Sequence, residues 1–233
     1  MRRSLPSYFC SEGQETVDGN ALDALEESFL GVLPARTRGG LIESGRLVDL
    51  AAGTLLYDPE LSIILSGSVR AFVADGSGRH LTVSYLRPSN SIGTSSAAGQ
   101  EFPLAFQSIT QCTVLRFPRS RFDQIRRLHP EVGWAAAKDL ARLLDDVLAE
   151  LARVAFQTIR ARVAHHLLAL ADGEDAASPS IHQADLASAV GSVREVVGRN
   201  LGQLRDAGLV EVSHSGVTAI NKAGLRLVAG QWG

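Results

Sequence analysis

Arg194, Glu195 and Arg199 lie within about two helical turns of one another near the C-terminus. Arginine donates paired hydrogen bonds to guanine O6 and N7, and glutamate accepts from the amino group of cytosine. Gly198 removes side-chain bulk between them, at some cost in helix propensity. Residues of these types at this spacing could read base edges in a DNA groove. Val193, in the turn just before them, is a further candidate contact.

A helix-turn-helix is the element that must position these groups. Residues 183–191 predict a short helix ending at Gly191, because glycine readily adopts the left-handed backbone of a helix terminus. A second helix is predicted over residues 194–204, with an apolar face at helical spacing. The residues that can bury one another across the two helices are Leu186, Val190, Val197, Leu201 and Leu204.

A β-hairpin is predicted after the second helix, with strands over 209–212 and 217–220 and His214 at its tip. Gln183 is a further candidate DNA contact, and His182 is either a substitute N-cap or a phosphate contact. Short helices around a glycine turn also occur in ordinary helical bundles. The charged face together with the hairpin favours a winged helix-turn-helix that binds double-stranded DNA.

A longer helical pattern precedes this segment. Its apolar residues recur at alternating steps of four and three, as in the a/d seam of a coiled coil: Leu140, Leu144, Val147, Leu151 and Val154. A helix that packs only on its own chain needs a wider apolar stripe. The pattern over 134–155 therefore predicts a homodimer, and packing against the chain's own β-domain is the alternative.

Residues 47–117 show the period of strands. Short segments rich in β-branched residues are separated by turn signals such as Ser66-Gly67 and Gly76-Ser77-Gly78, which predicts an antiparallel roll or barrel. A short amphipathic helix is predicted before them, over residues 21–33. The fold class is therefore α+β, with an N-terminal antiparallel β-roll, a long dimerisation helix and a C-terminal winged helix-turn-helix.

The segment VGSVREVVGRNL, residues 190–201, resembles the recognition motif of the cyclic-AMP receptor protein/fumarate-nitrate regulator (Crp-Fnr) superfamily. The resemblance extends to the helix over 159–164 and to the wing entry at 208–210. Upstream, residues 65–69 and 84–88 look like the β-roll of that family. The resemblance thus covers nearly the whole chain.

The resemblance implies three parts: a β-roll effector or sensor domain over 1–133, a dimerisation helix and hinge over 134–157, and a DNA-binding domain over 158–233. Ala155 and Phe156 fall at the family's interdomain hinge. A change in the β-roll would then reorient the DNA-binding domains about this hinge.

By the same resemblance, Arg194, Glu195 and Arg199 occupy base-reading positions. This implies a palindromic DNA operator with guanine-containing half-sites of the TGTGA type. RNA polymerase is the further partner that the family implies. Whether transcription rises or falls does not follow from the residues.

The loop that holds sugar and phosphate departs from the cyclic-nucleotide-binding members, which carry a Gly-Glu pair and an Arg-Ser/Thr pair there. Thr94 stands in place of the glutamate, and no Arg or Lys lies between Gly93 and Cys112 to neutralise a cyclic phosphate. We therefore expect an effector other than cyclic AMP bound in the usual manner, or none. The effector-pocket candidates are Ile92, Gly93, Thr94, Ser95, Val147 and Leu148, the last two replacing hydroxyls expected to meet the base.

The cofactor is unassigned. Two cysteines are too few for a four-thiolate iron–sulfur cluster within one chain, and the histidine spacing predicts no metal site. Cys112, inside a predicted strand, is interpreted as an inert core thiol, while a sensing role for Cys10 stays open. His80, at the end of a hairpin, keeps haem ligation open as an alternative.

The bulk composition narrows the class of protein. The chain has 233 residues, 45% of them hydrophobic, and a formal charge of −2, which argues neither for nor against a nucleic-acid partner. With no bilayer-length apolar run and no signal-peptide pattern, a cytoplasmic protein without a membrane partner is expected. The sequence shows no arrangement of catalytic residues, so an enzyme is not expected. The alternatives are a regulatory module that controls a partner protein and an architectural DNA-binding protein.

Overall fold

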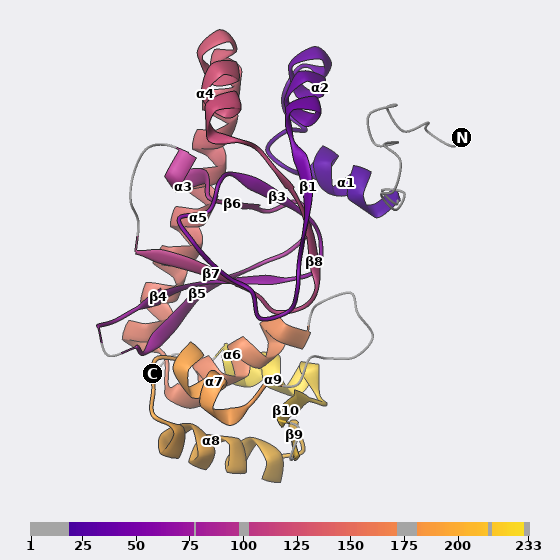
Figure 1. The fold of residues 1–233 in the computed structure, drawn as a ribbon. Helices are drawn as coiled ribbons and strands as arrows, with labels where there is room; N and C mark the ends of the chain where they lie inside the picture. The colour runs from indigo at the N-terminus through magenta and orange to yellow at the C-terminus, as the bar shows by residue number, and fades with distance from the viewer. Residues whose placement is uncertain (1–18, 77, 98–102, 172–180, 214–215, 231–233) are drawn as a thin grey trace. The chain divides into compact units, whose positions relative to one another are not determined.

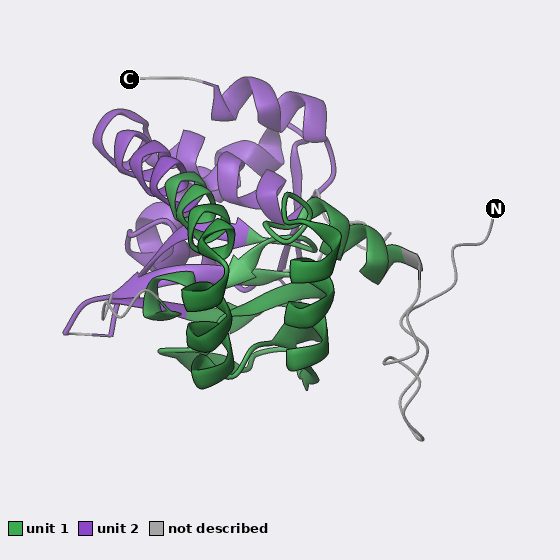
Figure 2. Cartoon of the chain, turned by 90° about the horizontal axis from the view of Figure 1, so that it is seen from above, with its two compact units in different colours: residues 1–69, 86–102, 106–142 green, residues 70–85, 103–105, 143–233 purple. Residues whose placement is uncertain are grey.

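The computed structural model describes residues 19–76, 78–97, 103–171, 181–213 and 216–230 (Figure 1). The chain divides into two compact units, coloured separately in Figure 2. Unit 1 comprises residues 1–69, 86–102 and 106–142, and unit 2 comprises residues 70–85, 103–105 and 143–233. Each unit has its own cluster of buried apolar side chains.

The helices and strands follow one another along the chain in the order that Figure 1 labels. The helices are α1 (Gly19–Glu27), α2 (Ala35–Ser44), α3 (Thr94–Ala97), α4 (Arg119–Leu128), α5 (Pro130–Phe156), α6 (Ile159–Ala171), α7 (Gln183–Ala189), α8 (Arg194–Asp206) and α9 (Lys222–Ala229). The strands are β1 (Arg46–Leu50), β2 (Leu55–Tyr57), β3 (Ser62–Ser66), β4 (Val69–Ala74), β5 (His80–Leu86), β6 (Ser91–Ile92), β7 (Leu104–Ser108), β8 (Cys112–Arg116), β9 (Val210–Ser213) and β10 (Gly216–Ala219).

Unit 1 holds a four-stranded sheet in the order β1-β8-β3-β6, and each neighbouring pair in it is antiparallel. The register between β3 and β8 shifts between Ile64 and Ser66, just before the predicted turn. Gly67 in that turn has a φ of 84°, and a Cβ there would lie 2.3 Å from the Gln111 carbonyl oxygen. Only glycine fits this position without rearrangement.

One apolar core joins this sheet to α1, α2, α4 and the start of α5. Its largest fully buried side chains are Leu30, Leu41, Ile63, Leu115 and Phe117. Burying a side chain of this size contributes about 1.5–3 kcal/mol. The strands that the sequence predicts are therefore stabilised on one side by helices, two of which (α2 and α4) the sequence pattern did not predict.

A second four-stranded sheet has the order β2-β7-β4-β5. Most of β4 and β5 belongs to unit 2, where residues 70–85 group with residues 143–233. The two sheets, the long α5 and the C-terminal helices with their hairpin confirm the predicted α+β fold class.

The first helix is shorter than the sequence predicts. α1 ends at Glu27 instead of continuing to residue 33. The Ser28 hydroxyl donates to the Leu25 carbonyl at 2.8 Å and accepts from the Leu30 N–H at 3.2 Å. A serine that bonds nearby backbone in this way competes with helix continuation. Val32, which the pattern placed on the apolar stripe, is exposed as a result.

The long helix begins earlier than predicted, at Pro130 instead of residue 134. Proline suits the first helical position, where its missing N–H leaves no bond unmade. In the described part of the chain, neither this helix nor any other is long and apolar enough to cross a membrane.

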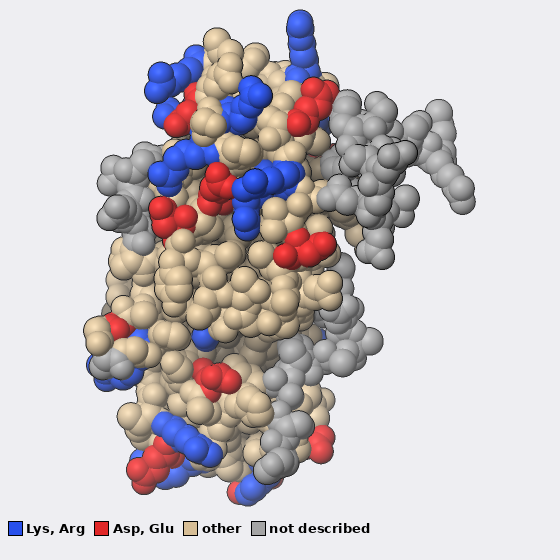
Figure 3. Space-filling model, in the orientation of Figure 1, with Lys and Arg blue, Asp and Glu red and all other residues tan. Residues whose placement is uncertain are grey.

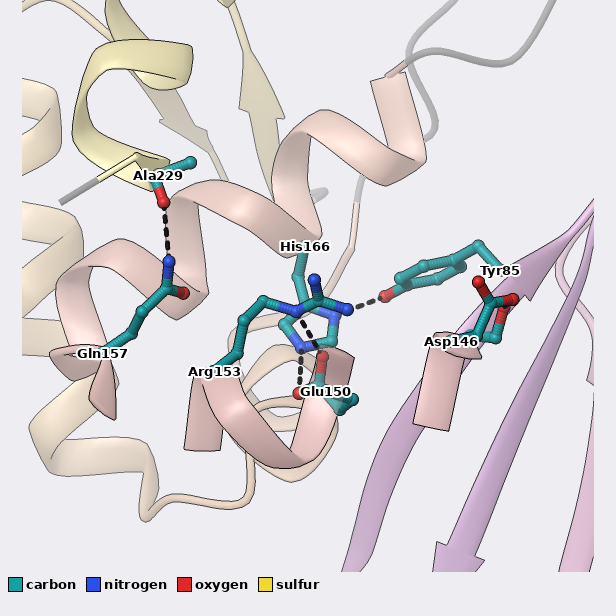
Figure 4. Close-up of polar contacts among 8 residues, drawn as sticks. Tyr85, Asp146, Glu150, Arg153, Gln157, His166 and Ala229 are labelled. Atoms are coloured by element: carbon teal, nitrogen blue, oxygen red, sulfur yellow. Dashed lines mark hydrogen bonds and ion pairs between the residues drawn. The ribbon is translucent and has the colours of Figure 1, made fainter. Parts of the chain in front are cut away.

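The chain leaves helical geometry between Phe156, the last residue of α5, and Ile159, the first of α6. Thr158 lies in this break, and its hydroxyl accepts from the Ala161 N–H at 3.2 Å. The hydroxyl therefore caps the N-terminus of α6. Gln157, also in the break, donates from its side-chain amide to the Ala229 carbonyl at 2.8 Å (Figure 4).

Candidate nucleic-acid interface

α7 and α8 bury the apolar residues that the sequence assigned to their shared face. Leu186, Val190, Val197, Leu201 and Leu204 are each at most 2% exposed and belong to the core of unit 2. Gly191, between the helices, has a φ of 63°, which confirms the predicted left-handed turn. The side of α8 that points away from this core is therefore fixed by packing.

That outward side carries the three predicted base-reading residues. Arg194, Glu195 and Arg199 are exposed in the first two turns of α8, and Val193, its N-cap residue, is exposed as well. On the face shown in Figure 3, basic and acidic side chains lie together over α8. The helix thus presents both donors and an acceptor to solvent, which is the chemistry that base-edge recognition requires.

Gln183, at the start of α7, lies against Gly198 of α8. A Cβ at Gly198 would come 2.5 Å from Gln183 Nε2, so the absence of a side chain at this position allows the amide to approach the helix. The structure therefore brings these two predicted residues together.

The two predicted histidine contacts have different outcomes. His182 occupies the N-cap position of α7, but its side chain makes no capping hydrogen bond to the described residues. His182 therefore stands at the predicted N-cap position without capping through its side chain, and the phosphate-contact hypothesis stays a prediction. His214, expected at the wing tip, lies outside the described residues.

The predicted wing is present as the antiparallel pair β9 and β10, shifted by about one residue from the expected bounds. Ile181 and Val217 exchange backbone hydrogen bonds of 3.2 and 2.9 Å, so the chain before α7 is tied to the wing. Gly216 permits this, because a Cβ there would lie 2.8 Å from the Ile181 carbonyl oxygen.

A buried polar cluster connects α5, α6 and β5 within unit 2 (Figure 4). Arg153 Nε lies 2.7 Å from Glu150 Oε2, and His166 Nε2 lies 3.9 Å from Glu150 Oε1. Tyr85 OH lies 3.0 Å from His166 Nδ1. At 2% exposure, His166 is a packing residue of this cluster and does not face solvent.

Burial sets the protonation states in this cluster. It lowers the pKa of His166 to about 3, and the nearby cationic groups add to the effect. It raises the pKa of Tyr85, so the hydroxyl keeps its proton and donates to Nδ1 of a neutral imidazole. The ring proton then sits on Nε2, facing Glu150, whose own pKa burial raises. The direction of each hydrogen bond in the cluster follows from these states.

Two hydroxyls of the predicted effector loop in unit 1 bond to a carboxylate of α5, a contact that the sequence did not predict. Ser91 and Thr94 both donate to Asp139 Oδ2 of α5, the latter at 3.0 Å. Ile92, Thr94 and Ser95 are buried, and Gly93 has a φ of 78° with the Pro59 carbonyl oxygen 2.3 Å from a Cβ position. Residues 98–102 of this loop lie outside the described part of the chain.

The predicted seam residues of α5 differ in exposure. Leu144 and Leu151 are 57% and 62% exposed, Val154 is 37% exposed, and Leu140 and Val147 are half-buried. Leu148, which the sequence assigned to the effector pocket, is 51% exposed. Leu144, Leu148 and Leu151 follow helical spacing i, i+4, i+7 and form one exposed apolar stripe. Ala155 and Phe156, the predicted hinge, are exposed at the end of the helix.

Cys112 and His80, the described residues considered for a cofactor or sensing role, both contact neighbouring groups of the chain. Cys112 is buried, and its thiol lies 3.3 Å from the Ser68 carbonyl oxygen, with its pKa raised by burial. The His80 ring stacks on Phe72 with 4.4 Å between ring centroids. Over the described ranges, no group of three or more His, Cys, Asp or Glu side chains could hold a metal ion. Cys10 lies outside those ranges.

Two family models match this chain, and together they span more than half of it. Residues 56–129 match the cyclic nucleotide-binding domain, and residues 161–228 match the Crp-like helix-turn-helix domain. The chain is 29% identical over 169 residues to the cAMP-activated global transcriptional regulator CRP of Salmonella typhimurium, which covers 67% of this chain and 80% of that protein.

Solved structures agree with this assignment. A CRP/FNR-family transcriptional regulator from Thermus thermophilus superposes with a TM-score of 0.68 at 24% identity, covering 81% of this chain and 100% of that chain. The c-di-GMP responsive global regulator CLP of Xanthomonas campestris superposes with a TM-score of 0.67 at 22% identity, covering 80% and 99%. At these identities the superpositions establish the fold. From the two matched domains and their arrangement along the sequence, this chain belongs to the Crp-Fnr superfamily of DNA-binding transcription regulators.

Proposed function

We propose that this chain is a homodimeric regulator that reads a palindromic DNA operator through α8 and does not respond to cyclic AMP bound in the usual manner. One observation carries the proposal. Arg194, Glu195 and Arg199 are exposed on a helix whose opposite residues, Val197 and Leu201, are buried. Buried packing fixes the helix, so the charged face is presented rigidly, and rigid presentation is what discrimination between bases needs.

The proposed contacts follow from the positions on α8. A recognition helix enters the major groove with its N-terminal residues at the base edges. Arg194 and Arg199 would donate to guanine and Glu195 would accept from cytosine, in half-sites of the TGTGA type. Val193, Gly198 and Gln183 would complete the base-facing surface, and His182 and His214 would contact the phosphate backbone.

The exposed stripe on α5 supports a second copy of this chain as its partner. Leu144, Leu148 and Leu151 remain in water in one protomer, although burying a leucine contributes about 1.5–3 kcal/mol. Self-pairing of α5 would bury all three, with Leu140, Val147 and Val154 beside them. A two-fold dimer would place two copies of α8 about one DNA turn apart, which matches a palindrome.

The effector loop supports the exclusion of cyclic AMP. Asp139 holds the hydroxyls of Ser91 and Thr94, and its carboxylate would repel a phosphate brought to the same turn. An effector pocket over Ile92, Gly93 and the neighbouring hydroxyls would therefore take a neutral or cationic group. CLP is described as c-di-GMP responsive, so effectors other than cyclic AMP act on this fold.

The remaining parts of the proposal concern how the regulator works. A sensor domain over 1–133, a dimer helix over 134–157 and a DNA-binding domain over 158–233 would be coupled at the hinge formed by Ala155 and Phe156. An effector that binds one arrangement more tightly would shift the population toward it. Such a regulator would act in the cytoplasm together with RNA polymerase.

The test is selection of DNA sites by the purified chain from a randomised duplex pool, followed by fluorescence anisotropy on the enriched duplex. Arg199→Ala should lose about 1–3 kcal/mol of binding free energy and discriminate less at the guanine that Arg199 contacts. Arg205→Ala is the matched control, because Arg205 is exposed in the last turn of α8 and pairs with Asp206 at 2.9 Å. It should bind as the unmodified chain does.

Two results would overturn the proposal. Equal binding to every duplex with a steep salt dependence would identify an architectural protein. No enrichment of any sequence would favour a regulatory module that acts on a partner protein.

A further inference from the structure

Strand β5 packs against the C-terminal helices along most of its length. Residues 70–85, which include most of β4 and β5, form one compact unit with residues 143–233 (Figure 2). The contacts come from four residues of β5, termed here the β5 latch: His80, Leu81, Ser84 and Tyr85.

The first half of the β5 latch holds the turn of the helix-turn-helix. Leu81 forms an isolated antiparallel bridge with Val190, the last residue before the glycine of the turn. The His80 N–H donates to Ser188 Oγ at 3.3 Å. The Leu81 side chain lies 3.2 Å from the Cβ position of Gly191, so a side chain at Gly191 would require the end of Leu81 to shift by a few tenths of an ångström.

The second half of the β5 latch reaches the helices that flank the hinge. Ser84 Oγ donates to Asp146 Oδ2 of α5 at 2.8 Å. Tyr85 OH donates to His166 Nδ1 of α6, and the two rings meet edge to face at 5.7 Å between centroids (Figure 4). His166 is buried, and its other nitrogen lies 3.9 Å from Glu150 Oε1, so the Tyr85 hydrogen bond joins β5 to a polar cluster that includes α5. The strand therefore contacts α5, α6 and α7 at once.

The strand also stands beside the start of the proposed recognition helix. An open cavity of about 760 Å³ is lined on one side by Arg79, His80 and Leu81 and on the other by Ser192, Val193 and Arg194. A DNA major groove is about 12 Å wide and admits one α-helix, whose diameter with side chains is about 10–12 Å. A groove that receives the first turn of α8 has no room for a strand at the same position.

We propose that the β5 latch is an autoinhibitory contact, which holds the helix-turn-helix where DNA cannot reach the start of α8 until the strand leaves the turn at Val190. The inference rests on the proposed DNA binding and adds the device that controls it. Any change that weakens the contacts of β5 raises the fraction of protein that can bind DNA. DNA binds only the unlatched form and therefore shifts the equilibrium toward it.

A reversible cross-link tests the latch in the full-length chain. Leu81→Cys and Val190→Cys are introduced together, in a background with Cys10→Ser and Cys112→Ala. Partners in an antiparallel bridge have Cβ atoms about 5 Å apart, close enough for a disulfide after small adjustment. The probe is the duplex enriched from the randomised pool.

The oxidised protein should bind that duplex at least about tenfold more weakly than the same protein after reduction with dithiothreitol. The two single-cysteine variants should bind equally well under both conditions, which controls for oxidation and for the change at Val190. Disulfide formation is checked by mass spectrometry. If the cross-linked and reduced forms bind equally tightly, β5 at the turn is compatible with DNA and the latch does not exist.

Loosening the latch should have the opposite effect. Tyr85→Phe removes the hydrogen bond to His166, and Leu81→Ala removes the contact at Gly191, so each should bind the duplex roughly three- to tenfold more tightly. Tyr57→Phe, at an exposed tyrosine of β2, is the matched control and should change nothing. Arg79→Ala should also leave binding unchanged, whereas clear weakening would mean that this hairpin contacts DNA and would overturn the inference.

Hydrogen exchange gives a readout that does not depend on affinity. The His80 amide, bonded to Ser188 Oγ, should be protected in the free protein and should lose protection when the duplex is added. Protection that persists or increases with DNA would overturn the latch while leaving DNA binding intact. Failure of the pool to enrich any sequence would instead overturn the proposed function, and the latch with it.

Discussion

The side-chain amide of Gln183 lies against Gly198, so close that a Cβ on Gly198 would come 2.5 Å from Gln183 Nε2. The first helix of the helix-turn-helix thereby places a side chain beside the middle of the proposed base-reading face of the second. Gly198 costs about 1 kcal/mol of helix propensity relative to alanine. The glycine at position 198 therefore lowers the stability of α8 but leaves room for the Gln183 amide beside the base-reading face.

Gly198→Ala should therefore weaken DNA binding without weakening the fold. The new methyl group would displace the flexible end of Gln183, while alanine restores up to about 1 kcal/mol of helix stability. We expect a several-fold loss of affinity in fluorescence anisotropy together with an unchanged or higher Tm.

Gly202→Ala provides the matched control for this experiment. Gly202 lies one turn further along α8, and no described atom lies within 4 Å of its Cβ position. The variant should gain stability by a similar amount and keep its affinity. A Gly198→Ala protein that binds as tightly as Gly202→Ala would show that the position of Gln183 is irrelevant to recognition.

Leu148→Lys should convert a dimer into a monomer. The lysine would place a charge in the centre of the exposed stripe between Leu144 and Leu151, where self-pairing would desolvate it. Light scattering should then report the mass of one chain, 24.8 kDa, at concentrations where the unmodified chain has twice that mass. Leu227→Lys is the control, since Leu227 is more exposed still but lies on α9. A dimer that survives Leu148→Lys must use another surface.

Cyclic AMP should leave the thermal stability of this chain unchanged. A ligand present at about 100 times its Kd stabilises its target by about 2.7 kcal/mol, which is easily seen as a rise in Tm. The carboxylate of Asp139 beside Ser91 and Thr94 opposes a bound phosphate, so we expect no rise at millimolar cyclic AMP. The CRP of Salmonella typhimurium, named as cAMP-activated, is the positive control. A comparable rise in both proteins would show that this loop accepts the nucleotide after all.

Acid should destabilise the fold through His166. Burial lowers its pKa in the folded chain to about 3, whereas an unfolded histidine titrates near 6.5. Between these values the unfolded state binds more protons, so the free energy of unfolding should fall as the pH drops from 7 toward 3. The charged groups around the ring are Arg70, Arg153, Arg162 and, with opposite sign, Glu150. His165 also lies beside the ring, and burial lowers its own pKa to about 4, so its own titration adds a smaller effect of the same sign.

Urea unfolding across this pH range measures the effect. His166→Gln should give a shallower pH dependence than the unmodified chain, and the exposed His182→Gln should not. Comparing variants isolates the imidazole from Glu150, whose raised pKa acts in the opposite direction as the pH rises. Parallel pH profiles for His166→Gln and the unmodified chain would show that the ring is accessible to protons in the fold.

The elements that the sequence predicted well share one property, which is that their signal is local. The turn at Gly191 and the buried face of α8 follow from apolar spacing and from the backbone freedom of one glycine. The short β-strands were predicted for the same reason. Where a local competitor intervenes, as Ser28 does after α1, the period alone extends the helix too far.

The features of the candidate site also separate into those with a local sequence signal and those without one. The sequence by itself determined which helix presents Arg194, Glu195 and Arg199, because the opposite face of that helix had to be buried. Only the tertiary structure decided what meets that helix: β5 against the turn, Tyr85 on His166 across 81 positions of chain, and Asp139 on Thr94 across 45. Contacts at such separations leave no periodic trace in a single sequence, since they depend on how whole elements pack and not on the spacing within any one of them.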